Sequence, residues 1–438
     1  MEYLSLEKDF ALRYNERMEE RVYLCIDLKS FFASVECVSR GLDPMCTNLV
    51  VADPERGDKT ICLAVTPAMK ALGVRNRCRI FEIPKNIQYI TASPRMKLYI
   101  DYAVRIYGIY LRYVAKEDIH VYSIDEVFMD VTGYLTLYGK NPREMAKLLM
   151  EEVLRETGIR ATCGIGTNLY LAKIALDITA KHAEDFIGEL SVATYRETLW
   201  THRPITDFWR IGPGTARRLE SLCIYTMGDV AHTAESLLYR HFGVDAELLI
   251  DHAWGLEPTT IADIHRYHSK TNCLTSGQVL MRDYTAEEGV LIVKEMMDLL
   301  CLEMVDRGVV TRSITLQVGY GSTWDRAFVK GTVSVPRETH SDMVWVKEIE
   351  SLYRSIVHPE AMIRRINITC NKITEEVNIQ YSLFDDPYEE QQHDRLQQAV
   401  VGLRKRFGKN AVVKGMNLEE HGTTIERNRQ IGGHKSGE

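Results

Sequence analysis

The sequence lacks the signatures of secreted, zinc-binding and membrane-spanning proteins. Its 10 cysteines include no Cys-x-x-Cys pair, so neither zinc-ligand spacing nor a disulfide framework is indicated. No run approaches the roughly 18 apolar residues that span a bilayer, and the charged N-terminus has no signal-peptide pattern. A hydrophobic content of 45% and a charged content of 26% exclude wholesale disorder. We therefore expect a protein of the reducing cytoplasm with no membrane partner.

An excess of positive charge is also missing. Lys and Arg number 54 against 61 Asp and Glu, a net charge of −7, which taken alone argues against a polyanionic partner. The average hides unlike regions, because residues 401–417 contain five basic residues and no acid. Net charge therefore bears on solubility, and the partner has to be inferred from local patterns.

The length of 438 residues suggests two to four domains at about 100–200 residues each. Short apolar runs alternate with helical periodicity, which favours layered domains of mixed α and β structure. We predict an α+β multidomain chain with a polar lead-in, a layered domain, a helical domain, a linker, a second layered domain and a flexible tail. These segments are 1–21, 22–200, 201–258, 259–272, 273–417 and 418–438.

Three carboxylates stand at the ends of strand-like runs. Asp27 stops the run 22–26, and Asp125-Glu126 interrupts a predicted strand pair 98 residues later. Acids at the ends of adjacent buried strands can converge, and hard oxygen ligands suit Mg²⁺. Two such ions, ~3.5–4 Å apart, clamp the attacking and leaving oxygens of a phosphoryl transfer. The alternative is that each acid occupies a turn, because Asp-Glu dipeptides are common.

The residues that flank these acids favour the metal site. Ile26 to Glu36 (IDLKSFFASVE) and Tyr122 to Asp130 (YSIDEVFMD) together resemble the two palm motifs of the Y-family DNA polymerases, the translesion enzymes. The Ser-Ile-Asp-Glu block is the most specific part of the likeness, which extends from about residue 22 to about residue 417. The chain looks most like the bacterial UmuC branch.

The resemblance implies the architecture of a right-handed polymerase. The expected parts are a palm, fingers, a helical thumb and an α/β little finger, at 22–44 with 93–200, 45–92, 201–258 and 273–417. The implied activity is that of a DNA-directed DNA polymerase for error-prone translesion synthesis in an SOS-type damage response. The implied partners are primer-template DNA and dNTP, with accessory subunits or a recombinase filament as further candidates.

The likeness also assigns the metal ligands. Asp27, Asp125 and Glu126 would hold two Mg²⁺ ions, with the carbonyl of Leu28 as a further ligand. Many relatives have Asp or Asn at the position of Lys29. This lysine departs from the family pattern but leaves all three matched acids in place.

Two adjacent aromatic residues are candidates for nucleotide contact. Phe32 occupies the position of the steric gate, the ring that meets the sugar 2′ face and excludes ribonucleotides. Phe31 is the second nucleotide-binding candidate. Helical periodicity requires that one of the two rings pack into the core.

Phosphoryl transfer also needs cations on the phosphates that are not transferred. Lys70 and Lys181 match the triphosphate-binding cations of the family. The common aromatic-x-x-Arg form is absent, because Pro67 replaces the aromatic residue and Lys70 the arginine. A lysine is a point charge without the bidentate fork of arginine. Lys173 belongs to the same family block, and its role stays open.

Two regions are candidates for DNA binding. The turn Gly212-Pro213-Gly214 resembles a helix–hairpin–helix, whose glycines let a phosphate approach the N-terminus of the next helix. Arg217 and Arg218 lie in the first turns of that helix. The second region is the basic block, residues 401–417, whose positive charges could bind the phosphates of the DNA backbone. Its candidate contacts are Arg404, Lys405, Arg406 and Lys409.

An acidic, polar stretch contains one short apolar motif. The segment 380–384 (QYSLF) resembles the pentapeptide that binds the bacterial sliding clamp. The matching positions are Gln380, Ser382, Leu383 and Phe384. An exposed Leu-Phe pair needs a surface that buries it, so we expect the clamp as a partner.

Two alternatives remain open at this level. A palm-type nucleotidyl cyclase also uses carboxylates and two metals, but the candidate DNA hairpin and clamp peptide argue against it. The other alternative is a catalytically weak accessory protein that binds DNA and the clamp. The three retained acids argue against this second possibility.

Overall fold

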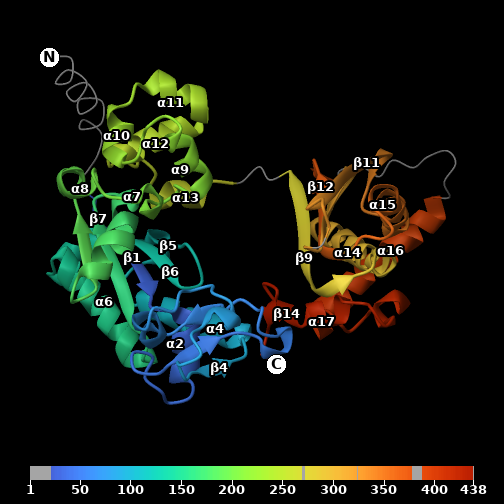
Figure 1. The fold of residues 1–438 in the computed structure, drawn as a ribbon, viewed down its shortest axis with the longest axis horizontal. Coiled ribbons are helices and arrows are strands. Elements are labelled where there is room, and N and C mark those ends of the chain that lie inside the picture. The colour runs from blue at the N-terminus through green and yellow to red at the C-terminus, as the bar shows by residue number, and fades with distance from the viewer. Residues whose placement is uncertain (1–20, 269–271, 323, 377–386, 438) are drawn as a thin grey trace. The chain divides into compact units, whose positions relative to one another are not determined.

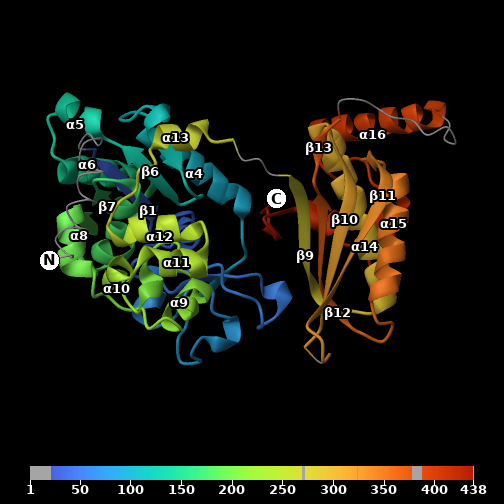
Figure 2. The same cartoon turned by 90° about the horizontal axis from the view of Figure 1, so that it is seen from above.

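The computed structural model describes four stretches of the chain, 21–268, 272–322, 324–376 and 387–437. The chain divides into two compact units between residues 268 and 269. Figures 1 and 2 show the elements of each unit from two directions. Within the described stretches, no helix has the length and apolar character needed to cross a membrane.

A five-stranded sheet forms the centre of the first unit (Figure 1). Its order is β5-β6-β1-β7-β8, with β1 antiparallel to both β6 and β7 and with β7 parallel to β8. The strands are Tyr23–Leu28 (β1), Ile119–Val121 (β5), Glu126–Asp130 (β6), Ala161–Gly166 (β7) and Ile187–Leu190 (β8). The apolar runs predicted to form β1, the β5–β6 pair and β7 do form them.

Side-chain alternation along β1 gives this sheet two different faces. Leu24, Ile26 and Leu28 enter the largest core cluster, to which α2, α4 and α6 also contribute. Tyr23 and Cys25 face the opposite side and pack with residues of α7. The helices are Phe31–Val38 (α2), Met96–Tyr110 (α4), Thr132–Tyr138 (α5), Pro142–Thr157 (α6) and Leu169–Ile174 (α7), which continues in a π-helical turn Ala175–Thr179 and a 3-10 turn Ala180–His182.

The segment expected to form the fingers contains a small sheet ordered β3-β2-β4 and the short helix α3. Thr66 Oγ1 accepts a hydrogen bond from the Met69 amide at 3.4 Å, and Pro67 fills the first helical position, where its missing N–H costs nothing. The proline therefore starts the helix that carries Lys70. The elements are Leu49–Val51 (β2), Ala64–Val65 (β3), Pro67–Ala71 (α3) and Ile90–Ala92 (β4).

The segment expected to form the thumb is helical and has its own core cluster. Its helices are Pro213–Glu220 (α9), Met227–His232 (α10), Glu235–Phe242 (α11) and Asp245–Ala253 (α12). Val192–Leu199 (α8), at the end of the segment expected to form the palm, packs into the same core cluster. The element before α9 is a 3-10 turn of three residues, Ile205–Asp207. The first arm of the expected helix–hairpin–helix is thus shorter than the sequence suggested.

The second unit is built on a sheet ordered β11-β10-β12-β9, with β13 paired to β10. Helices α14 and α15 contribute to its core. The mixed α and β structure predicted for the second layered domain is present. The elements are Cys273–Tyr284 (β9), Ala286–Arg307 (α14), Val309–Tyr320 (β10), Phe328–Thr339 (β11), Asp342–Ile356 (α15), Ile363–Asn371 (β12), Thr374–Glu375 (β13) and Pro387–Phe407 (α16).

The prediction of an irregular linker over 259–272 is wrong in its first half. Ile261–Arg266 forms helix α13 in the first unit. Thr260 and Asp263 form a capping box, in which each backbone amide donates to the side chain of the other residue. Ile261 is buried in the cluster that contains Tyr23 and Phe128, so packing and capping together hold this short helix.

The prediction of a flexible tail over 418–438 is also wrong for the residues described. Glu295 of α14 is 1% exposed and accepts hydrogen bonds from Asn417 Nδ2 at 2.9 Å and from the Thr423 amide at 2.7 Å. A buried carboxylate with several donors ties this segment to the second unit. The elements are a 3-10 turn Gly415–Leu418, Thr424–Asn428 (α17), Gln430–Ile431 (β14) and His434–Lys435 (β15).

We expect Gly164→Ala to destabilise the first unit by about 1–3 kcal/mol or more. A Cβ at Gly164 in β7 would collide with the Ala172 carbonyl and the Leu176 amide, so α7 would have to move. The measurement is the free energy of unfolding in denaturant. The control is Gly108→Ala in α4, where a Cβ meets no atom within 4 Å and helix propensity favours alanine. Equal stability of the two variants would contradict this packing.

Candidate active site

The three acids meet at one end of the central sheet. Asp27 lies directly opposite Glu126 in the β1–β6 pair, so their side chains leave the same face. The Leu28 amide donates to the Asp125 carbonyl at 2.9 Å, which holds Asp125 beside β1. Ser123 Oγ donates to Asp125 Oδ1 at 2.7 Å. The convergence predicted from the strand ends is present.

Crowding of these acids changes the proton affinity of Asp27. Desolvation by burial raises its pKa to about 7, and the negative charges of Asp125 and Glu126 act in the same direction. Lys173 opposes this shift. A carboxylate whose pKa is raised by burial and by neighbouring carboxylates marks a place where a cation is favourable.

Glu126 is held by a buried ion pair. Lys173 Nζ donates to Glu126 Oε2 at 2.9 Å and to Asp177 Oδ1 at 3.1 Å, while Cys25 Sγ donates to Glu126 Oε1 at 3.2 Å. Glu126 and Lys173 are 7% and 8% exposed. Burial alone would lower the pKa of Lys173, but its neighbours Cys25, Asp177 and Glu126 raise it above the usual value, so Lys173 keeps its charge. The open role of Lys173 is therefore to neutralise and orient Glu126.

The donor set fits a hard divalent cation only in part. Within the described stretches, no group of three or more His, Cys, Asp and Glu side chains is arranged to hold a metal ion. Asp27 and Asp125 offer carboxylate oxygens at the sheet end, as Mg²⁺ prefers. Glu126 points toward Lys173 and Cys25, so its oxygens are already hydrogen-bonded.

Cations lie near the two acids that lack an ion-pair partner in the described stretches, Asp27 and Asp125. Desolvation and the neighbouring ammonium of Lys181 lower the pKa of Lys70, whereas Asp27 and Asp125 raise it. The fold thus brings Lys70 within the electrostatic reach of the acids and places Lys181 close enough to Lys70 to influence it. Desolvation, followed by the charge of Lys70 and of Arg160, lowers the pKa of Lys29. Sequence reasoning missed Arg160, which only the β1–β7 pairing brings to this edge.

The two neighbouring phenylalanines have different surroundings. Phe31 is 2% exposed in the core, so the structure does not favour the nucleotide contact expected of it. Phe32 is partly exposed, and its ring stacks on Tyr99 with centroids 4.7 Å apart. Tyr99 is itself held by Glu36, whose Oε1 accepts from its hydroxyl at 2.8 Å and from Arg95 Nε at 3.0 Å. Phe32, the candidate steric gate, therefore packs against a tyrosine ring that hydrogen bonding holds in place.

The start of α9 presents a smooth backbone surface. Gly212 and Gly214 are exposed, and a Cβ at either would meet nothing within 4 Å. Arg217 Nε donates to the first carbonyl of α9 at 3.3 Å, and Arg218 Nη1 donates to a carbonyl of α11 at 3.3 Å. The glycines leave room for a phosphate, while both arginines are partly engaged within the helical domain.

The basic block of the second unit is less uniform than its sequence. Lys405 forms an ion pair with Asp306 of α14. Desolvation by burial lowers the pKa of Arg404. Arg406 and Lys409 are exposed, and in the described part of the chain neither has an acidic partner. The electrostatic footprint therefore rests mainly on these last two residues.

Lys414, one of the five basic residues counted in 401–417, is neutralised inside the second unit. Lys414 Nζ pairs with Asp298 Oδ1 at 2.6 Å and also with Asp342, and both acids are buried. Counting Lys414 in the basic footprint was wrong, because its charge is used to hold α14 and α15 together. The clamp-like segment 380–384 lies outside the described residues.

Comparison with known proteins agrees with this geometry. The impB/mucB/samB family matches over residues 26–177, and its C-terminal domain matches over residues 274–383. UvrX of Bacillus subtilis (strain 168), named as a UV-damage repair protein, is 31% identical over 94% of this chain and 97% of its own length. DNA polymerase IV 2 of the same strain is 28% identical over 95% and 99% of the two chains.

The solved structure of a Y-family DNA polymerase chimera, Dbh-Dpo4(243-245)-Dbh, has the same fold. Its TM-score is 0.61 at 20% identity, with 81% of this chain and 99% of that chain covered. Fold and sequence together define a Y-family DNA polymerase, an enzyme of DNA-directed DNA synthesis. Within that class, the chain belongs to the impB/mucB/samB family. Its substrates are accordingly primer-template DNA and dNTP, and enzymes of this class use divalent metal ions.

We expect Lys173→Met to lower stability by about 3–5 kcal/mol, because it leaves Glu126 buried and unpaired. The double variant Lys173→Met/Glu126→Gln should recover most of this loss. Unfolding in denaturant measures both. Arg155→Met is the matched control, since the Arg155 side chain is 66% exposed in its ion pair with Glu152 and such pairs contribute little. A single Lys173 variant as stable as this control would rule out the proposed pairing.

Proposed function

We propose that this polymerase performs error-prone translesion synthesis in an SOS-type response to DNA damage. The observation that carries the chemistry is the meeting of Asp27, Asp125 and Lys70 at one sheet end, with Lys181 beside Lys70. The relative named for UV-damage repair supports the damage context. The reaction transfers a nucleotide from dNTP to the primer 3′-hydroxyl and releases pyrophosphate.

Two Mg²⁺ ions are the proposed cofactor. Asp27, Asp125 and the Leu28 carbonyl would hold them, and Glu126 would join through an oxygen that Lys173 now orients. Bound Mg²⁺ supplies Lewis-acid stabilisation of the oxygens that attack and leave phosphorus. Lys173 orients the buried Glu126 through their ion pair, while Asp27 and Asp125 would supply the negative potential that attracts divalent cations.

The remaining residues orient the substrates. Lys70 and Lys181 would neutralise the β- and γ-phosphates, where charge accumulates as the bond to the leaving group breaks. Phe32, supported by Tyr99, would exclude a ribose 2′-hydroxyl by contact. Extra volume in a well-packed contact forces side chains or backbone to shift, so the gate would discriminate by steric exclusion.

Duplex DNA would be held by backbone contacts on both units. In the helical domain, the amides at Gly212 and Gly214 with Arg217 and Arg218 are the proposed phosphate site. In the second unit, the proposed contacts are Arg404, Lys405, Arg406 and Lys409. Exposed Arg406 and Lys409 support this most directly. Such contacts are independent of sequence and weaken as salt concentration rises.

The bacterial sliding clamp is the proposed protein partner, through Gln380, Ser382, Leu383 and Phe384. Accessory subunits or a recombinase filament are further proposed partners of a UmuC-like enzyme. The family membership disfavours a nucleotidyl cyclase. A catalytically weak accessory protein differs from an active polymerase in one measurable property, primer extension.

Asp125→Asn should abolish primer extension while DNA affinity changes less than about twofold. The change removes an anionic metal ligand but no phosphate contact. Extension of a labelled primer and a DNA-binding titration measure the two effects. The control is Glu151→Gln, which changes an exposed residue of α6, and this variant should extend the primer normally. Loss of DNA binding together with extension would count against the metal-site assignment.

Phe32→Ala should increase the ratio of ribonucleotide to deoxyribonucleotide insertion by at least about tenfold, because space opens beside the sugar. Single-nucleotide insertion with each triphosphate gives the ratio. Phe81→Ala is the control, since Phe81 is 57% exposed in the fingers segment. An unchanged sugar preference would place the gate elsewhere.

Replacing Leu383 and Phe384 together with Ala should weaken clamp binding in a pull-down and leave extension without the clamp unchanged. The two side chains would supply most of the apolar contact area. Leu418→Ala removes another apolar side chain of the second unit, 70% exposed, and serves as the control. Equal clamp retention by all three proteins would refute the peptide assignment.

A further inference from the structure

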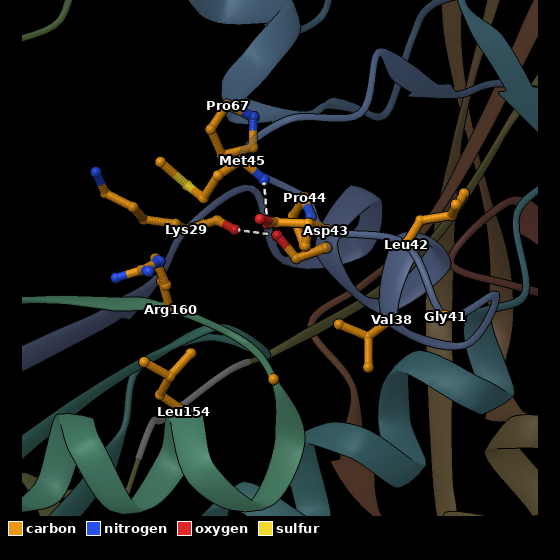
Figure 3. A pocket seen from close by; sticks show the side chains of 12 residues that line it. Lys29, Val38, Gly41, Leu42, Asp43, Pro44, Met45, Pro67, Leu154 and Arg160 are labelled. Carbon is orange, nitrogen blue, oxygen red and sulfur yellow. Dashed lines mark hydrogen bonds between the residues drawn. The ribbon is translucent and has the colours of Figure 1, made fainter.

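A recess of about 430 Å³ opens beside the candidate active site (Figure 3). Its walls come from the end of β1, the loop after α2, the start of α3, and the turn between α6 and β7. Its volume lies within the range of small-ligand sites. None of the roles assigned above uses this recess.

Strand pairing places two cations on one wall. Leu28 and Ala161 are the last partners of the β1–β7 pair, and the Lys29 amide donates to the Arg160 carbonyl at 2.9 Å. The two side chains therefore leave neighbouring backbones at the same edge. In Figure 3, both charged ends point to the same side of the recess.

These two cations have no carboxylate partner within the described residues. Lys29 Nζ lies 3.5 Å from the centre of the Phe186 ring, which steadies the ammonium but leaves its charge uncompensated. The acid in the lining is Asp43, whose carboxylate accepts from the Met45 amide at 2.8 Å and from Cys46 Sγ at 3.6 Å. Two unpaired cations in a concave wall focus a positive potential.

The recess adjoins the proposed triphosphate site. Lys29 follows Leu28 in the chain, two residues after Asp27. Pro67 lines the recess and begins α3, the helix that carries Lys70. Lys70 and Arg160 both lie close enough to Lys29 to lower its pKa, so Lys29 stands between the proposed triphosphate site and the recess.

We propose that the recess is an exit subsite for pyrophosphate, in which Lys29 and Arg160 receive the leaving group after nucleotidyl transfer. This proposal rests on the proposed polymerase reaction. In that reaction the primer 3′-oxygen bonds to the α-phosphorus, and the bond from the α-phosphorus to the oxygen that bridges to the β-phosphate breaks. Pyrophosphate keeps that electron pair, and the proton of the 3′-hydroxyl passes to water. A highly charged leaving group then occupies a cationic pocket beside the active site.

The test is product inhibition of single-nucleotide insertion by inorganic pyrophosphate. In Lys29→Asn and in Arg160→Gln, the inhibition constant for pyrophosphate should rise at least about fivefold, because each loses a charge-assisted contact. The KM for dNTP should change less than about twofold. Lys85→Asn removes an exposed cation of the fingers segment that does not line the recess, and its inhibition constant should equal that of the parent protein.

Three outcomes overturn the proposal. An unchanged inhibition constant for pyrophosphate in both variants refutes the exit subsite. An equal rise of this constant in the Lys85→Asn control shows a general effect of charge. A KM for dNTP that rises in parallel assigns Lys29 and Arg160 to the triphosphate site. Arg160 is exposed, so Arg160→Gln keeps the test valid where Lys29→Asn misfolds.

Failure of the polymerase itself gives a different result. If the parent protein extends no primer, the proposed function fails. Calorimetric titration with magnesium pyrophosphate then tests the recess alone. Weaker binding in Arg160→Gln than in Lys85→Asn supports an anion site, and equal binding refutes one.

Discussion

Two like charges placed opposite each other are the constraint on which the first unit depends. The β1–β6 register puts Asp27 across from Glu126, an arrangement that costs free energy in a partly buried sheet. Lys173 offsets this repulsion through its ion pair with Glu126. Burial raises the pKa of Asp27, and the negative charges of Asp125 and Glu126 add to that shift. A site strained by negative charge is a site that divalent cations stabilise.

The position of Lys173 depends in turn on how closely α7 approaches the sheet. Gly164 and Gly166 of β7 have no space for a side chain, because the backbone of α7 lies against them. The π-helical turn after α7 then directs the chain toward Lys181. Backbone packing, ion pairing and the placement of the triphosphate cations are therefore consequences of one strand–helix contact. A shift of register by one residue would turn Asp27 to the other face of the sheet.

Much of this arrangement can be predicted from the sequence, for identifiable reasons. The strands that carry Asp27 and Glu126 are short apolar runs. Acids at or beside strand ends converge whenever the strands pair. Helix α13 was missed because only Ile261 and Ile264 mark its apolar side. The polar tail gave no sign of order, since its anchor is the buried carboxylate of Glu295. Ion pairs formed across the fold explain the misassigned Lys414, which a count of charges along the chain does not reveal.

The most direct measurement is extension of a primer past a site-specific thymine dimer by the purified protein with Mg²⁺ and four dNTPs. We expect insertion opposite the dimer and continued synthesis beyond it, at a rate that exceeds any insertion without metal. If the protein binds the same DNA but adds no nucleotide on either the damaged or the undamaged template, the assignment of this site to translesion synthesis is contradicted.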